Sequence, residues 1–411
     1  MSDHGTLTKG DFVMQERLQR FGGWLAGMVI PNIGAFIAWG LITALVIPTG
    51  WLAELGISTE TWTTGDDGEG PGMSTRNLVG PMIQYLLPLL VAYTGGKMVH
   101  GHRGGVLAAI AAMGVIGSQG TLTADDGTVL TIQPPQFLGA MIIGPLSGWV
   151  MKKIDEFLEP RTPAGFEMLF NNFSQGIAGL GLVTVAYNII GPIMAAVANV
   201  FGNAVEGLAD ANLLPIADIP IEVAKVLFLN NAINHGVLTP LGAEQVAEKG
   251  RSIYYMLESN PGPGLGLLGA YWFAGKGLAK LSAPGAIIIH FLGGIHEVYF
   301  PYVLMNPVMI GAMWAGGITA DLVFVATDAG LTTPPSPGSI FAYIAGLPPE
   351  GGAAFGVIAG VAVGAIMSFV VGTALLRLFP VKDMADTDVD AVGAGDGIPD
   401  VPGMNIPGAT A

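Results

Sequence analysis

The sequence predicts an all-α polytopic membrane protein with about eight to ten transmembrane helices. Charged residues make up only 11% of the 411-residue chain, against roughly 25% in an ordinary soluble domain. Hydrophobic residues make up 51%, and the mean hydropathy is +0.58. Because so few charges do not cover the surface of a water-soluble protein, we expect much of the apolar surface to face lipid.

Long segments without charge predict the individual helices. A helix needs about 20 apolar residues to cross the hydrocarbon core, and its backbone groups must be satisfied internally. A membrane β-barrel would instead show alternating segments of about 10 residues, which the sequence lacks. The charge-free stretches are Phe21–Ala53, Asn77–Gly96, Gly104–Ala124, Gly127–Met151, Met168–Val205, Val298–Ala320 and Gly351–Leu376.

Basic and acidic connections alternate along the chain. Arg17 and Arg20 precede the first stretch, the connection Glu54–Arg76 is acidic, and Arg377 ends the last stretch. Positive residues favour the cytoplasmic side of a membrane protein. We therefore expect a multi-pass plasma-membrane protein with an even number of spans and both termini in the cytoplasm.

Three parts follow from this organisation. Residues 1–20 form a cytoplasmic N-terminal segment, residues 21–380 a membrane transport domain, and residues 381–411 an acidic cytoplasmic tail whose composition is typical of disorder. Within the domain, Asn260–Gly264 and Thr333–Ser339 are rich in Pro and Gly and cannot continue a helix. Such breaks either are plain loops or line a cavity, so we expect broken or re-entrant segments around a central substrate site.

Composition also excludes several kinds of chemistry. The chain has no cysteine, which leaves no disulfide or thiol chemistry. No His or carboxylate cluster has metal-ligand spacing, no phosphate-binding loop indicates direct use of ATP, and no basic cluster indicates nucleic acid. We expect no cofactor. His100 and His102 lie in a basic, Gly-rich loop that we interpret as solvated, with docking of an anionic partner as a weaker alternative.

Glu297 is the strongest candidate for a functional residue. It lies between two apolar stretches, follows the pair Gly293-Gly294, and has His296 beside it. A carboxylate at membrane depth is costly and is therefore a functional candidate, and paired glycines allow a break or a close backbone approach. The alternative is a carboxylate at a helix end near water.

A second group of polar residues falls in the apolar segment Leu227–Gly236. In a helix, Asn230 and Asn234 share one face, and Asn231 and His235 share another. Amide side chains both donate and accept hydrogen bonds, as the hydroxyls of a polyol do. The alternative is hydrogen bonding between helices for packing alone.

A third group contains Glu167, Asn171 and Asn172. Glu167 lies close to the charged connection Lys152–Arg161, which favours a structural role for Glu167 and Asn171. Asn172 stays among the candidate substrate-binding residues.

The chain resembles the membrane C domain of bacterial mannitol permeases of the phosphotransferase system. The resemblance extends from Phe21 to Arg377. The motifs that carry it are Met28–Gly40, Leu86–Lys97, Leu227–Gly236, Glu258–Gly264 and Gly293–Pro307, the last of which includes Gly-Ile-His-Glu.

This resemblance implies a homodimer with alternating access that takes up a hexitol, with mannitol as the expected substrate. It implies that Glu297 is the catalytic residue, which orients a sugar hydroxyl or accepts its proton, and that His296, His235 and Asn231 contact the sugar beside it. Because the chain contains no Cys, a separate phosphorylated B protein is expected to supply the phosphoryl group from a phosphocysteine. The chain would then be the membrane component of a mannitol phosphotransferase.

Two features depart from the family pattern. The connections Gly56–Arg76 and Gly117–Gln133 are longer than expected, and Gln136 stands where an acidic residue is expected. Two other functions stay open on the sequence alone. One is a secondary polyol transporter in which Glu297 couples uptake to protons, and the other is a sugar-binding membrane sensor.

Overall fold

A computed structural model describes residues 21–46, 52, 78–118, 122–123, 129–130, 135–335 and 337–380. Nearly all of these residues are helical, which confirms the predicted all-α membrane class. The predicted segment 1–20, the tail 381–411 and the long acidic connection Gly56–Arg76 lie outside the described residues. Two short antiparallel strands, β1 (Leu122–Thr123) and β2 (Val129–Leu130), precede helix α6 (Phe137–Leu158).

Five described helices are long and apolar enough to cross a membrane. They are Phe21–Thr43, Val79–Gly117, Glu167–Asp210, Pro307–Ala326 and Gly351–Leu378. A shorter apolar helical stretch covers Gly277–Leu292. Proline and π-helical turns interrupt several of these segments, as the sequence predicts for helices that surround a site.

The N-terminal part of the fold runs from the first span to α8. Its elements are the 3₁₀ turn η1 (Ile30–Asn32), α2 (Ile33–Val46), α4 (Val79–Pro81), the π-helical turn η4 (Met82–Leu86), α5 (Leu87–Gly117), α6 (Phe137–Leu158), the 3₁₀ turn η5 (Glu159–Arg161), α7 (Glu167–Val185), the π-helical turn η6 (Ala186–Ile190) and α8 (Gly191–Asp210).

Helix α5 reverses direction within its length. His100 and Gly101 leave the helical conformation, and Gly101 adopts a φ of +53°, which a glycine does without steric cost. Beyond the turn, the backbone returns against itself, so that a Cβ on Gly96 would lie 2.3 Å from the carbonyl oxygen of Gly104. Helix α5 is therefore a hairpin of two antiparallel segments packed at small residues, a typical contact between membrane helices.

The C-terminal part contains many short elements. They are α9 (Leu214–Val226), α10 (Asn230–Ile233), the π-helical turn η7 (Asn234–Leu238), α11 (Thr239–Lys249), α12 (Tyr254–Leu257), α13 (Pro261–Ala274), α14 (Gly277–Ile287), the π-helical turn η8 (Ile288–Leu292), the 3₁₀ turn η9 (His296–Val298), α15 (Phe300–Met305), the 3₁₀ turn η10 (Pro307–Met309), α16 (Ile310–Ala326), α17 (Ile340–Ala345) and α18 (Gly351–Leu378).

Of the two predicted helix breaks, Thr333–Ser339 forms a loop where it is described, whereas most of Asn260–Gly264 belongs to the start of a helix. Thr333–Ser339 is non-helical wherever it is described and separates α16 from α17. Asn260–Gly264 does interrupt the chain after α12, but Pro261 begins α13 rather than a loop, and the Asn260 side chain accepts a hydrogen bond from the Gly262 backbone N–H at 2.9 Å. Proline suits this position because the first helical turn does not need its N–H.

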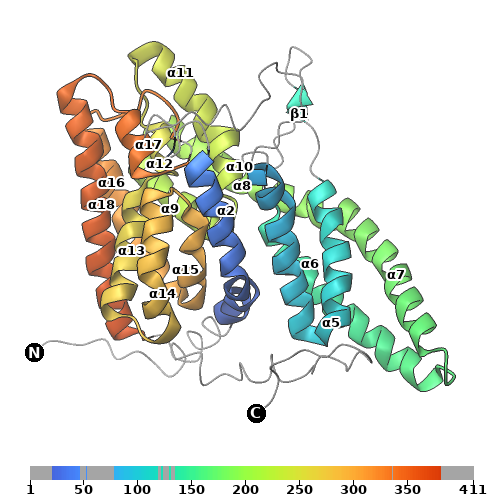
Figure 1. Ribbon diagram of the computed structural model, residues 1–411. Coiled ribbons are helices and arrows are strands. Elements are labelled where there is room, and N and C mark those ends of the chain that lie inside the picture. The colour runs from blue at the N-terminus through green and yellow to red at the C-terminus, as the bar shows by residue number, and fades with distance from the viewer. Residues whose placement is uncertain are drawn as a thin grey trace, which may run out of the picture.

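The helices form two groups (Figure 1). Helices α5, α6 and α7 pack together on one side, and α13, α16 and α18 pack together on the other, with α2 between the groups. One apolar core joins the first span, α5 and α6 to α13–α15, and a second core joins α8–α12 to α16–α18. The candidate site lies where these two cores meet.

Candidate functional site

The turn that holds Glu297 depends on the glycine pair before it. Gly294 has a φ of +74°, and a Cβ there would lie 2.6 Å from the backbone nitrogen of Ser339. Only glycine fits this conformation and this close approach. The chain can thus leave η8, make the short turn η9, and enter α15, which confirms the predicted break at Gly293-Gly294.

Glu297 lies inside the protein, where its side chain is only 5% exposed. The Asn230 Nδ2 atom on α10 donates a hydrogen bond to Glu297 Oε1 at 3.0 Å, and Asn231 also interacts with this carboxylate. Among the described residues, the Asn230 Oδ1 atom is buried without a hydrogen-bond partner, so it remains able to accept a hydrogen bond. The structure thus brings together two segments that are 67 residues apart.

His296 is also buried, but it faces a different neighbour. Its Nε2 atom lies 3.2 Å from the carbonyl oxygen of Gly338, which accepts a hydrogen bond and so places the proton on Nε2. Its ring lies edge-on to that of His290, with centroids 4.6 Å apart. Within the described part of the chain, the Nδ1 atom of His296 is buried without a partner, so it remains able to accept a hydrogen bond.

The other predicted residues are less closely joined to Glu297. Asn234 is half-buried, and its Oδ1 atom accepts from Thr239 Oγ1 at 3.3 Å. The side chain of His235 lies outside the described part of the structure. Asn172 is exposed on α7, which packs against α5, and among the described residues nothing connects it to Glu297. Its role in binding stays a prediction.

Glu258 is a second buried carboxylate that sequence reasoning did not select. It lies between α12 and α13, is 6% exposed, and interacts with both Asn230 and Glu297. Glu258 therefore lies close to the same amide that donates to Glu297. The signal was available, because Glu258 stands in an otherwise apolar stretch next to the Pro-Gly repeat, which is the same argument that selects Glu297.

A buried ion pair lies next to these carboxylates. Lys225 Nζ is 2.7 Å from Glu222 Oε1 on the same helix, and both side chains are at most 1% exposed. The Tyr299 hydroxyl donates to the other Glu222 oxygen at 3.4 Å. Sequence analysis missed this pair, although Asp218, Glu222 and Lys225 recur at helical spacing on α9. A buried lysine partly offsets the negative charge around Glu258 and Glu297.

Comparison with known proteins shows which family this chain belongs to. The family described as "Phosphotransferase system, EIIC" matches residues 26–316. The chain belongs to this EIIC family. The mannitol-specific EIICB component of Geobacillus stearothermophilus is 54% identical over 361 residues, which cover 88% of this chain and 70% of the relative.

Two further relatives bear mannitol-specific names. The EIICB component of Bacillus subtilis is 50% identical over 364 residues, covering 89% of this EIIC chain and 69% of the relative. The EIICBA component of Escherichia coli is 50% identical over 372 residues, covering 90% of this chain but 53% of the relative. The family match over residues 26–316 includes Asn230, Glu258 and Glu297.

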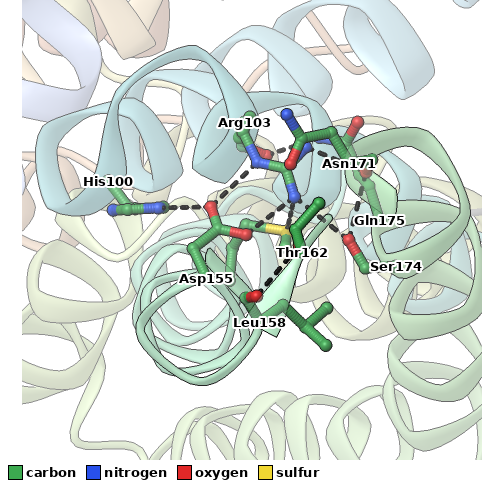
Figure 2. Close-up of polar contacts among 9 residues, drawn as sticks. His100, Arg103, Asp155, Leu158, Thr162, Asn171, Ser174 and Gln175 are labelled. Atoms are coloured by element: carbon green, nitrogen blue, oxygen red, sulfur yellow. Dashed lines mark hydrogen bonds and ion pairs between the residues drawn. The ribbon is translucent and has the colours of Figure 1, made fainter. Parts of the chain in front are cut away.

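A separate polar cluster ties three helices of this EIIC chain together at the turn of the α5 hairpin (Figure 2). Arg103 donates to both carboxylate oxygens of Asp155 on α6, at 2.8 and 2.7 Å, and to the backbone oxygen of Asn171 on α7 at 2.8 Å. His100 Nε2 lies 2.7 Å from Asp155 Oδ2. His100 is thus paired, which corrects the expectation that it is solvated, because Asp155 is buried beside it.

The polar residues at the start of α7 have the structural role expected of them. Glu167 accepts a hydrogen bond from the Gly165 backbone N–H at 2.9 Å, which satisfies a donor at the helix N-terminus. The carbonyl of Asn171 accepts from Arg103 as described above. Among the described residues, no group of three or more His, Cys, Asp or Glu side chains is arranged to hold a metal ion.

Proposed function

We propose that this EIIC chain carries mannitol across the plasma membrane and presents it for phosphorylation by a separate phosphorylated B protein. The main support is the pair of buried carboxylates, Glu297 and Glu258, which both lie close to the Asn230 amide. A polyol offers adjacent hydroxyls that donate to carboxylates and accept from amides. We take mannitol as the substrate because the similar proteins are named as mannitol-specific.

In this proposal, Glu297 accepts a hydrogen bond from one hydroxyl and Glu258 from a neighbouring one. The unpartnered Asn230 Oδ1 and His296 Nδ1 atoms accept from others, and Asn231, Asn234, His235 and Asn172 are the further candidate contacts. Hydrogen bonds to charged acceptors are stronger than those between neutral groups. Such a site therefore distinguishes a polyol from an apolar molecule of similar size.

The same carboxylates favour release after phosphorylation. Phosphorylation adds a charge of about −1.5 to −2 at neutral pH. Close to Glu297 and Glu258 this charge is repelled, while Lys225 is already paired with Glu222 at 2.7 Å. The product is therefore bound more weakly than the substrate. Catalysis itself depends on holding the terminal hydroxyl of the sugar in line with the phosphocysteine of the B protein.

Orientation and assembly are part of the proposal. The start of the first span and the end of α18 lie at the same end of the molecule in Figure 1, which fits the predicted cytoplasmic position of both. Lys97 and Arg103 flank the turn of the α5 hairpin, and a basic turn favours the cytoplasm. We expect a homodimer in which alternating access exposes the site first to the outside and then to the B protein.

Uptake into membrane vesicles tests this function directly. Vesicles that contain the chain are supplied with labelled mannitol, with and without the phosphorylated B protein. We expect mannitol phosphate to form inside only when that protein is present. Accumulation of free mannitol driven by a pH gradient would instead support proton-coupled transport, and binding without either result would support a sensor. The family match does not favour these two alternatives.

A further inference from the structure

An apolar groove lies where α13 packs against both α14 and α18 (Figure 1). Its volume is about 790 Å³, within the range of roughly 300–1,000 Å³ for sites that hold small molecules. The lining is apolar except at one residue, Lys280. The residues that the argument uses are Gly266, Gly269, Phe273, Lys280, Ala365 and Phe369.

Missing side chains on α13 create the floor of the groove. A Cβ on Gly266 would lie 2.2 Å from the carbonyl oxygen of Ala365, so α13 and α18 touch there through their backbones. Gly269 lies nearly one turn further along α13, where a Cβ would lie 3.2 Å from the Phe369 ring. The missing side chain therefore leaves space beside that ring. The Phe273 and Phe369 rings, 5.9 Å apart, form one wall. Phe273 is 61% exposed, so this wall faces the lipid around a membrane protein.

One end of the groove is positively charged. Lys280 Nζ lies 3.4 Å from the carbonyl oxygen of Phe273, and the Arg377 guanidinium lies 5.9 Å from the centre of the Phe273 ring. Helices α13, α14 and α18 contain no aspartate or glutamate. No carboxylate on the three helices that form the groove therefore neutralises these two cations.

We propose that this groove binds one anionic phospholipid, with an acyl chain along the Gly266–Phe369 floor and the phosphate between Lys280 and Arg377. Apolar surface alone would accept any lipid, and the two cations select a negatively charged head group. Trp272, which is 56% exposed beside Phe273, suits the boundary between acyl chains and head groups, where Trp is enriched. This site is independent of the proposed mannitol site.

Native mass spectrometry of the full chain in detergent tests the proposal. The probes are palmitoyl-oleoyl phosphatidylglycerol, which is anionic, and palmitoyl-oleoyl phosphatidylcholine, which is zwitterionic. We expect the wild type to retain one phosphatidylglycerol preferentially. The double variant Lys280→Gln, Arg377→Gln should bind it about 30-fold more weakly, which is about 2 kcal/mol at 1.4 kcal/mol per tenfold change. Equal binding of the two lipids by the wild type would overturn the proposal.

Two further variants separate the effect of charge in the groove from the effects of net charge and groove volume. The double variant Lys152→Gln, Lys249→Gln makes the same change in net charge at exposed lysines outside the groove, and should bind phosphatidylglycerol as the wild type does. Ala365→Trp fills the groove and should weaken binding of both lipids while both cations remain. If the groove variants bind as the wild type does, or if inorganic phosphate displaces the lipid, no lipid site exists there.

Discussion

At the scale of single residues, the site depends on a few polar side chains that the fold keeps from water. The cost of burying Glu297 is reduced by the hydrogen bond from Asn230 and by the nearby ion pair of Lys225 and Glu222. Among the described residues, the Asn230 Oδ1 and His296 Nδ1 atoms stay buried without a hydrogen-bond partner. We propose that a guest with several hydroxyls donates to them, because a buried acceptor without a partner is costly.

Substitution of Glu297 by Gln gives the clearest test at this scale. The change keeps the size of the side chain but removes its charge, so hydrogen bonds from sugar hydroxyls weaken by about 1.5–3 kcal/mol. We expect mannitol binding, measured by equilibrium dialysis, to fall by about 10- to 100-fold, and phosphorylation to be lost. Glu248→Gln, at an exposed position on α11, is the matched control. Normal phosphorylation by the Glu297→Gln variant would exclude this site.

At the scale of secondary-structure elements, glycine controls how closely helices approach. The α5 hairpin closes because Gly96 and Gly104 leave room for each other's backbone. The turn at His100-Gly101 needs a conformation that glycine adopts readily. The charge pattern already separates Asn77–Gly96 from Gly104–Ala124, and these contacts show that the two segments pack antiparallel around a tight turn.

Gly96→Ala and Gly181→Ala form a matched pair of substitutions. A Cβ on Gly96 would lie 2.3 Å from the Gly104 carbonyl oxygen, whereas a Cβ on Gly181 meets nothing within 4 Å. We expect Gly96→Ala to lower the free energy of unfolding by about 1–3 kcal/mol through overpacking. Gly181→Ala, in α7, should raise it by up to about 1 kcal/mol through helix propensity. Unfolding in SDS measures both, and equal effects would contradict the hairpin contact.

At the scale of the whole molecule, polar ties connect helices that are far apart in sequence. Arg103 joins the α5 hairpin to α6 through Asp155 and to α7 through the Asn171 carbonyl. Arginine suits this position because its planar group donates to both oxygens of one carboxylate. The tie holds the ends of three helices as one unit beside the apolar cores.

Asp155→Asn tests how much this tie contributes. The Asp155 side chain is 6% exposed, and its loss of charge removes the negative charge that is paired with Arg103. We expect the free energy of unfolding in SDS to fall by about 3 kcal/mol. The neighbouring Glu156→Gln removes an exposed pair with Lys153, with side chains 49% and 55% exposed, and should change it by less than about 1 kcal/mol. Equal losses would show that the tie contributes no more than a surface pair.

The sequence by itself determined the membrane class and the break at Gly293-Gly294, and it selected Glu297 as the strongest candidate for a functional residue. Each of these follows from local properties, because a charge in an apolar stretch is costly and a glycine pair permits a turn wherever the chain places them. Sequence also placed Asn230 and Asn231 among the polyol-binding candidates, since amides both donate and accept.

Only the tertiary structure decided which of these residues meet. Asn230 contacts Glu297, and His100 pairs with Asp155, across at least 55 positions of sequence. The burial of Glu258 close to Asn230 follows from the way the short helices pack. Hydropathy and helical periodicity report on neighbours along the chain. They carry no information on contacts between distant helices, which depend on the shape of the packed side chains.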